Sequence, residues 1–144
     1  MQDLNSKLAE YPDPFWRRFK VMQADLDGFC HVNNAIYLNW LDATFWEHTR
    51  AAGQSEQACI DQNRSMAAIP HEIDYLSSAF LDDDVVVFNQ IALNDGKPRA
   101  SRRFQVVRLG NRKTVLCARS SYECTILTTG APPACQKFPE PPMA

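Results

Sequence analysis

The chain of 144 residues is 45% hydrophobic and 22% charged, which is typical of a single globular domain with a buried core. Its formal net charge of -2 argues against a surface for nucleic acid or for an anionic membrane. No stretch reaches the roughly 18 consecutive apolar residues of a membrane span, and the first residues show no secretory signal pattern.

Cysteine usage narrows the cellular setting. The five cysteines, at positions 30, 59, 117, 124 and 135, are odd in number and contain no C-x-x-C spacing. This pattern argues against a disulfide framework or a zinc site. We therefore expect a cytoplasmic protein, since free thiols persist in a reducing compartment.

The first elements in chain order are an arm and a strand. We expect one domain over residues 1–144, in which residues 1–12 form a loose N-terminal arm that runs into YPDP. Residues 15–23, FWRRFKVMQ, predict a strand because they are rich in aromatic and β-favouring residues and contain no Gly or Pro.

Residues 35–52 predict a long helix. Asn33 or Asn34 can cap its start by accepting a backbone N–H of the first turn, and Gly53 suits the position just after its end. Apolar residues occupy nearly every side of the first three turns, which predicts a helix buried all round. At about 1.5 Å per residue, this helix is a rod of roughly 27 Å that other elements must cover.

The remaining segments supply that cover. A polar loop at 54–64 precedes strand-like segments on either side of Pro70, and further strands follow at 85–93, 100–109 and 114–127. The segments NDGK (94–97) and GNRK (110–113) predict hairpin turns, with Asp-Gly and Gly-Asn able to adopt positive φ. Apolar and polar residues alternate along the last strand, which predicts a sheet with one buried face.

These elements predict an α+β domain in which an antiparallel sheet wraps around one long buried helix, a hotdog-like fold. The tail at 128–144 contains five prolines and should be irregular. Lys97, Arg99, Arg102 and Arg103 form a small basic cluster that we expect to be a solvated strand face.

Polar side chains crowd residues 24–34, immediately before the apolar helix. The motif D-x-x-x-H-V-N-N-A-x-Y, from Asp27 to Tyr37, resembles the hotdog-fold acyl-CoA thioesterases of the 4-hydroxybenzoyl-CoA thioesterase-like family. The resemblance covers roughly residues 15–137, although outside the motif it is one of pattern only. Two positions depart from the family: Cys30 stands where glycine is frequent, and Ser77-Ser78 replaces an expected proline.

The resemblance implies the roles of the motif residues. Asp27 would be the catalytic carboxylate, the helix N-terminus near Asn34 would polarise the thioester carbonyl, and the site would lie at a dimer interface. Asp27 would either attack the carbonyl or deprotonate a water, and a thiol with a pKa near 8.5 leaves without an acid. We predict that the catalytic groups are Asp27 and Asn34, and that the substrate-binding residues are His31, Asn33 and Tyr37.

Each residue also has a structural interpretation. Asp27 and Asp25 are both suited to turns, and only Asp27 matches the family motif. His31 either holds the loop by hydrogen bonds or contacts substrate, and the sequence leaves both open. Cys30 is disfavoured as a nucleophile because adjacent side chains rarely form a nucleophile–base pair. His48, late in the helix, is expected to be structural.

The leading hypothesis is an acyl-CoA thioesterase that releases free CoA and a carboxylic acid. CoA would be part of the substrate, so we expect no metal and no bound cofactor, and the basic cluster is a weak candidate for its phosphates. The alternatives are an acyl-carrier-protein thioesterase and a non-catalytic acyl-thioester-binding hotdog module. Because one protomer leaves sheet edges open, we expect a homodimer or higher homo-oligomer and no nucleic-acid or membrane partner.

Overall fold

The computed structural model describes residues 8–9, 14–93 and 99–126. Most of the expected arm, the NDGK turn and the tail at 128–144 therefore lie outside the described residues. Leu8 and Ala9 do belong to the described part, and they pack on the outer face of the sheet beside Trp16 and Leu109.

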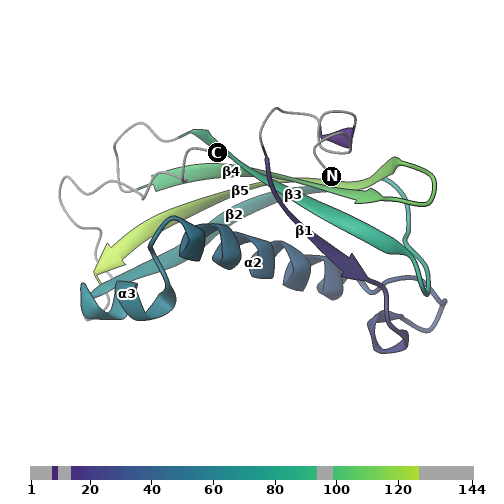
Figure 1. Cartoon of the computed structure of the whole chain (residues 1–144), viewed down its shortest axis with the longest axis horizontal. Helices are drawn as coiled ribbons and strands as arrows, with labels where there is room; N and C mark the ends of the chain where they lie inside the picture. The colour runs from purple at the N-terminus through teal and green to yellow at the C-terminus, as the bar shows by residue number, and fades with distance from the viewer. Residues whose placement is uncertain (1–7, 10–13, 94–98, 127–144) are drawn as a thin grey trace.

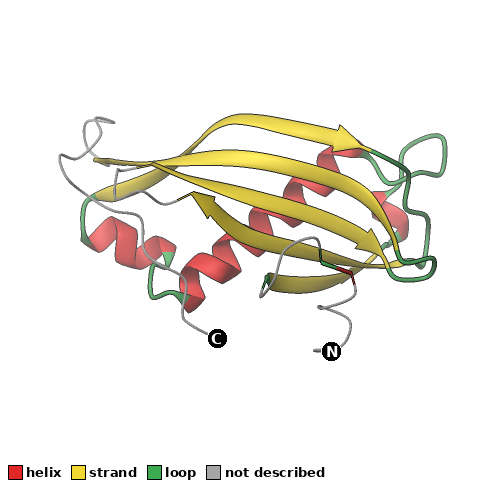
Figure 2. Cartoon of the chain, turned by 90° about the horizontal axis from the view of Figure 1, so that it is seen from above, coloured by secondary structure: helices red, strands yellow, loops and turns green. Residues whose placement is uncertain are grey.

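Within these ranges, five antiparallel strands form one sheet in the order β1-β3-β4-β5-β2. The strands are β1 (Phe15–Lys20), β2 (Arg64–Tyr75), β3 (Asp84–Leu93), β4 (Arg99–Arg108) and β5 (Lys113–Ile126). The long helix α2 (Asn34–Ala51) runs along one face of this sheet (Figures 1 and 2). The predicted α+β class, with a sheet curved over one helix, is confirmed.

The ends of α2 follow the sequence signals. Asn33 is the N-cap, and its side-chain oxygen accepts the N–H of Ala35 at 3.0 Å. At the other end, Gly53 has φ of 86°, the left-handed conformation that glycine adopts at little cost.

The prediction that α2 is buried all round is wrong for the protomer. Leu38 is 41% exposed, and Asn39 and Asp42 are also exposed, so one face of the helix is open. The reason is geometric, because a single sheet covers only one side of a helix; the opposite side of α2 is uncovered in Figure 1.

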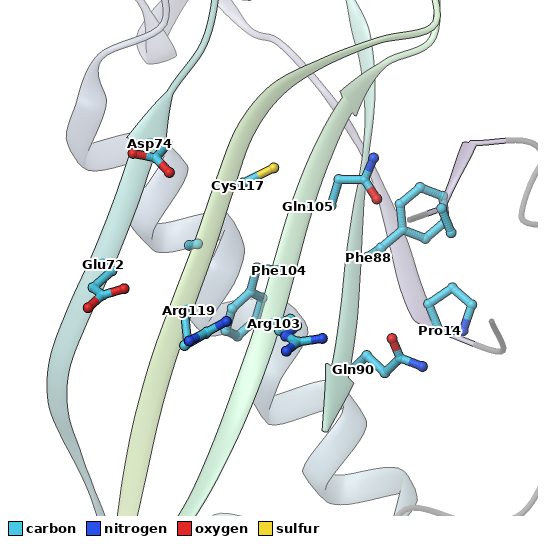
Figure 3. Close-up of a pocket in the computed structure, with 12 residues that line it drawn as sticks. Pro14, Glu72, Asp74, Phe88, Gln90, Arg103, Phe104, Gln105, Cys117 and Arg119 are labelled. Atoms are coloured by element: carbon cyan, nitrogen blue, oxygen red, sulfur yellow. The ribbon is translucent and has the colours of Figure 1, made fainter. Parts of the chain in front are cut away.

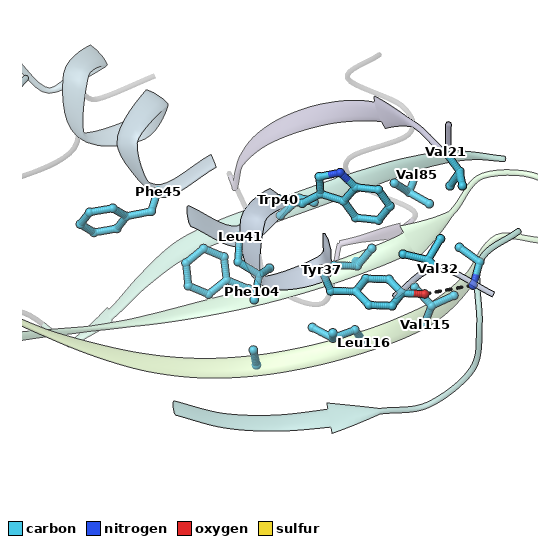
Figure 4. Packing of buried hydrophobic residues seen from close by; sticks show 14 of the residues in the cluster. Val21, Val32, Tyr37, Trp40, Leu41, Phe45, Val85, Phe104, Val115 and Leu116 are labelled. Atoms are coloured by element: carbon cyan, nitrogen blue, oxygen red, sulfur yellow. Dashed lines mark hydrogen bonds between the residues drawn. The ribbon is translucent and has the colours of Figure 1, made fainter. Parts of the chain in front are cut away.

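The core fills the space between α2 and the sheet. Aromatic side chains of the helix interdigitate there with branched side chains of the strands (Figure 4). The fully enclosed members with the lowest exposure include Val21, Phe45, Val85, Val87, Val106, Val115 and Leu116.

Two local predictions need correction. The expected loop at 54–64 contains a short helix, α3 (Glu56–Asp61), whose N-cap Ser55 accepts the N–H of Ala58 at 3.1 Å. In the turn between β4 and β5, positive φ falls on Arg112 (58°) rather than on the Gly-Asn pair. Around Pro70, by contrast, the two strand-like segments join as β2, and the register shifts between Ile69 and His71.

A buried polar cluster lies beside the C-terminal half of α2. Arg102 is only 2% exposed, and its Nη1 donates to Nδ1 of His48 at 2.9 Å. The guanidinium carbon lies 4.6 Å from the ring centroid of Phe45, and no carboxylate pairs with it among the described residues. Burial lowers the pKa of Arg102 to about 10. The expectation of a solvated strand face is therefore wrong for Arg102, which shares its face with Phe104 rather than with Arg103.

We predict that His48 makes the fold sensitive to acid. Burial, with a smaller contribution from the charge of Arg102, lowers the pKa of His48 to about 4 from 6.5. In the unfolded chain His48 is therefore protonated as the pH falls below about 6.5, whereas in the folded chain it is protonated only near pH 4. The free energy of unfolding should fall across this window as pH decreases, by at most about 3 kcal/mol from this group.

Urea denaturation at pH 7 and pH 4.5 measures this effect. His48→Gln is the control, because it keeps an acceptor for Arg102 and cannot titrate. The variant should lose less stability than wild type between the two pH values. An equal loss in both proteins would show that carboxylates elsewhere cause the acid sensitivity.

Candidate active site

Asp27 builds the loop that precedes α2. Its Oδ1 accepts the backbone N–H groups of Phe29 at 2.8 Å and His31 at 3.1 Å, and its own N–H donates to the carbonyl of His31 at 2.7 Å. Its Oδ2 has no hydrogen-bond partner within the described ranges. The half-buried carboxylate thus uses one oxygen to shape the loop, and the other is available for chemistry.

The contacts of Asp25 agree with its structural interpretation. Its Oδ2 accepts the N–H of Met22 at 2.8 Å across the single 3-10 turn η1 (Gln23–Asp25). Its carbonyl accepts the N–H of Asn33 at 2.8 Å, which ties the start of the loop to the helix cap.

The backbone N–H groups in the first turn of α2 differ in their partners. The N–H of Ala35 donates to the Asn33 side chain, and the N–H of Ile36 donates to the Asn33 carbonyl at 2.9 Å. The N–H of Asn34 has no partner among the described residues. A free N–H at the positive end of a helix dipole suits a developing oxyanion. The contribution of Asn34 would come from its backbone. Asn33 caps the helix through Oδ1, and its contact with substrate stays a prediction.

A second loop, residues 76–83 between β2 and β3, packs against the first. The N–H of Val32 donates to the carbonyl of Ala79 at 3.2 Å, and the N–H of Ala79 donates to the hydroxyl of Tyr37 at 3.0 Å (Figure 4). Tyr37 is 2% exposed, and burial raises its pKa. Tyr37 therefore ties the first turn of α2 to the 76–83 loop, while its contact with substrate stays a prediction.

His31 sits where the two loops meet. It is exposed, its Nδ1 lies 3.5 Å from Oγ of Ser78, and its ring contacts Phe80 edge-on with centroids 5.2 Å apart. The sequence pattern did not single out the 76–83 loop as part of the site. The one available signal was the Ser77-Ser78 departure from the family pattern.

Backbone strain marks both loops. Cys30 has φ of 62° and Asp82 has φ of 66°, conformations that L residues adopt at a cost of about 1 kcal/mol or more. The glycine that is frequent at the position of Cys30 in the resembled family is thereby explained.

We predict that Cys30→Gly raises the free energy of unfolding by about 0.5–1 kcal/mol, because relief of the left-handed strain outweighs the chain entropy of glycine. Thermal or urea unfolding measures it. Asp82→Gly is the matched comparison and should gain less, since Asp tolerates this region better. Destabilisation by Cys30→Gly would show that the thiol makes a contact worth more than the strain.

Large apolar side chains are exposed on and around these loops. Phe29 is 84% exposed and lies two residues after Asp27. The other members, at 38–58% exposure, are Met22, Leu38, Tyr75, Leu76, Phe80 and Leu81. Apolar side chains gathered at the mouth of a polar site are typical of a surface that binds a ligand or another chain.

A cavity of about 380 Å³ lies elsewhere, on the face of the sheet away from α2 (Figure 3). Arg103 on β4 and Arg119 on β5 are opposite each other in the strand register. Both line the cavity, together with Glu72 and Asp74 on β2. None of the motif residues 27–37 lines this cavity. It is therefore separate from the loop site.

The described part of the chain contains no group of three or more His, Cys, Asp or Glu side chains that could hold a metal ion. No helix within the described residues is long and apolar enough to cross a membrane.

Comparison with known proteins adds a family model and several solved structures. A model described as the acyl-ACP thioesterase C-terminal domain matches residues 9–68, which include the whole motif. A search of curated proteins found no significant match.

Three solved structures illustrate the similarity. A 1,4-dihydroxy-2-naphthoyl-CoA thioesterase from Synechocystis is 19% identical, with a TM-score of 0.73 over 89% of this chain and 90% of that one. A Staphylococcus aureus protein solved in complex with CoA is 17% identical (TM-score 0.79, 88% and 78% covered). The probable thioesterase YbaW from Escherichia coli is 24% identical (TM-score 0.71, 83% and 88% covered). At these identities the structures establish the fold, and the predicted resemblance to hotdog-fold thioesterases is confirmed at that level.

Proposed function

We propose that this chain is a thioester hydrolase that cleaves an acyl-CoA to free CoA and a carboxylic acid. The observation that carries the proposal is that Asp27, a carboxylate with an uncommitted oxygen, lies in the loop that leads into α2, whose first residue Asn34 has an unpaired N–H. Their positions match the motif, and the similar structures named as thioesterases support the reaction class.

The chemistry needs few groups. The Asn34 N–H would stabilise the oxyanion as the thioester carbonyl is attacked. Asp27 would either attack the carbonyl carbon, forming a mixed anhydride that water then hydrolyses, or remove the proton from an attacking water. In both routes the C–S bond breaks and the thiolate departs, since a thiol pKa near 8.5 makes it a good leaving group. His31 and Asn33 would contact the substrate.

The carrier of the acyl group is the main alternative within this proposal. A solved structure in complex with CoA and another named as a CoA thioesterase favour CoA. The matching family model, described as part of an acyl-ACP thioesterase, favours acyl-carrier protein. The third hypothesis, a binding module without catalysis, predicts binding with no thiol release.

The first experiment is a thiol-release assay on short, long and aromatic acyl-CoAs, with the same acyl groups on acyl-carrier protein in parallel. Turnover of at least one acyl-CoA with higher kcat/KM than its carrier-protein counterpart is the expected result. Preference for the carrier protein would select the alternative substrate. Absence of thiol release from every member would overturn hydrolysis.

The proposal includes a homodimer or higher homo-oligomer. Among the described residues β2 pairs with β5 alone, so its other edge, twelve residues long, has no described neighbour, and Tyr75 and Leu76 at its end are exposed. We expect light scattering to give at least twice the 16.4 kDa of one chain. A mass of one chain at micromolar concentration would contradict this.

A cytoplasmic location and the lack of a bound cofactor also belong to the proposal.

A further inference from the structure

Ser77-Ser78 replaces the proline that the resembled family has before the next strand, and Ser78 is the residue of this pair that contacts His31. A proline there would carry no hydrogen-bonding side chain. In this chain Ser78 instead presents a hydroxyl group, and its Oγ lies 3.5 Å from Nδ1 of His31. This contact joins the β2–β3 loop to the loop of Asp27.

The backbone around Ser78 is held on both sides. The N–H groups of Leu76 and Ser77 both donate to the carbonyl of Val115, at 2.9 and 3.2 Å. Ala79 follows directly, and both of its backbone polar groups are paired, with Val32 and Tyr37. Ser78 therefore has little freedom to move away from His31.

The far end of the loop is also anchored. The N–H of Phe80 donates to Asp83 Oδ2 at 2.7 Å, and Arg108 pairs with the same carboxylate at 2.7 Å. The guanidinium of Arg108 lies over the Phe80 ring, 5.1 Å from its centroid. The Phe80 ring is thus fixed, and its edge-on contact with His31 limits rotation of the imidazole.

The two contacts on His31 restrict the imidazole from different directions. The Ser78 hydroxyl contacts Nδ1, and the Phe80 side chain packs against the ring. Nε2 has no partner among the described residues, and His31 is exposed. The separation of 3.5 Å between Ser78 Oγ and His31 Nδ1 is long for a hydrogen bond. Catalytic hydrogen bonds are often long in the absence of substrate and shorten when it binds.

We propose that Ser78 is a positioning residue that fixes the His31 imidazole through Nδ1, so that Nε2 stays available to the thioester. This inference rests on the proposed hydrolysis at the same loop. It resolves the two interpretations of His31, because one ring nitrogen holds the loop and the other meets the substrate. Phe80 acts with Ser78 by packing and makes no hydrogen bond to the ring.

A double-mutant cycle tests the inference. Ser78→Ala should lower kcat/KM about three- to tenfold, the range expected from loss of one hydrogen bond, and Ser78→Thr should restore it to within about twofold. In a His31→Ala background, Ser78→Ala should have almost no further effect. Ser77→Ala is the matched control, since Ser77 is exposed and its side chain has no described partner.

Ring ¹⁵N chemical shifts of His31 provide a second measurement, which would not change if Ser78 had only a structural role in its loop. Ser78→Ala should change the ratio of the two imidazole tautomers, and Ser77→Ala should not. Wild-type activity in Ser78→Ala, or an equal loss with and without His31, would overturn the positioning role. If wild type releases no thiol from either carrier, the proposed function fails. The tautomer ratio still tests the contact between Ser78 and His31 in that case, and an unchanged ratio in Ser78→Ala would reject it.

Discussion

Asp27→Asn is expected to lower kcat for thioester hydrolysis at least about a hundredfold, within the range that general-base catalysis supplies. The substitution is isosteric, and the amide oxygen can still accept the N–H groups of Phe29 and His31 that Oδ1 accepts in wild type. The loop should therefore keep its shape while it loses the charge and the free carboxylate oxygen. Steady-state kinetics on the best substrate of the panel measures the effect.

Asp25→Asn is the matched control. It makes the same chemical change two residues earlier, at a carboxylate that accepts the backbone N–H of Met22. Activity within about threefold of wild type is expected for this variant. Full activity in Asp27→Asn would remove Asp27 from the reaction, and equal losses in both variants would point to loop damage.

Phe45→Ala should reduce the free energy of unfolding by about 4 kcal/mol, the middle of the range for a large aromatic side chain removed from a core. Phe45 is 1% exposed and stacks on Tyr122 with ring centroids 4.0 Å apart. Its ring also faces the guanidinium of Arg102. The variant would leave a cavity beside a buried charge that has lost its aromatic neighbour.

Urea denaturation of wild type and Phe45→Ala checks this value. The slope of the unfolding free energy against urea concentration is compared between the two proteins. Phe29→Ala is the control, because a ring that is 84% exposed should contribute less than about 0.5 kcal/mol in the protomer. A loss below about 1.5 kcal/mol for Phe45→Ala would mean that the core closes around the gap.

Local signals predicted the elements that local physics determines. Asn33 and Gly53 predicted the ends of α2 because caps and left-handed residues act within one turn. The alternation along β5 predicted that Leu116 and Tyr122 are buried, as observed. Asp27 was selected by the family motif, since Asp25 and Asp27 are both suited to turns and only Asp27 matches that motif.

The predictions that failed depend on what lies across the fold. Alternation along β4 places Arg102 on the face of Phe104, but grouping it with Arg103 by charge hid this periodicity. The open face of α2 follows from how far the sheet curves, which no single helix encodes. Ser78 reaches His31 only because β1 pairs with β3 and brings the two loops together.

The strand order also has a consequence for synthesis of the chain. β2 is made soon after α2, yet its partner in the sheet is β5, the last strand of the five. On the ribosome α2 and β2 therefore emerge with apolar surface and a strand edge uncovered, a state prone to misassociation. The β1–β3 pairing that joins the two loops forms from earlier segments. The loops of the candidate active site can thus meet before the sheet over α2 is complete.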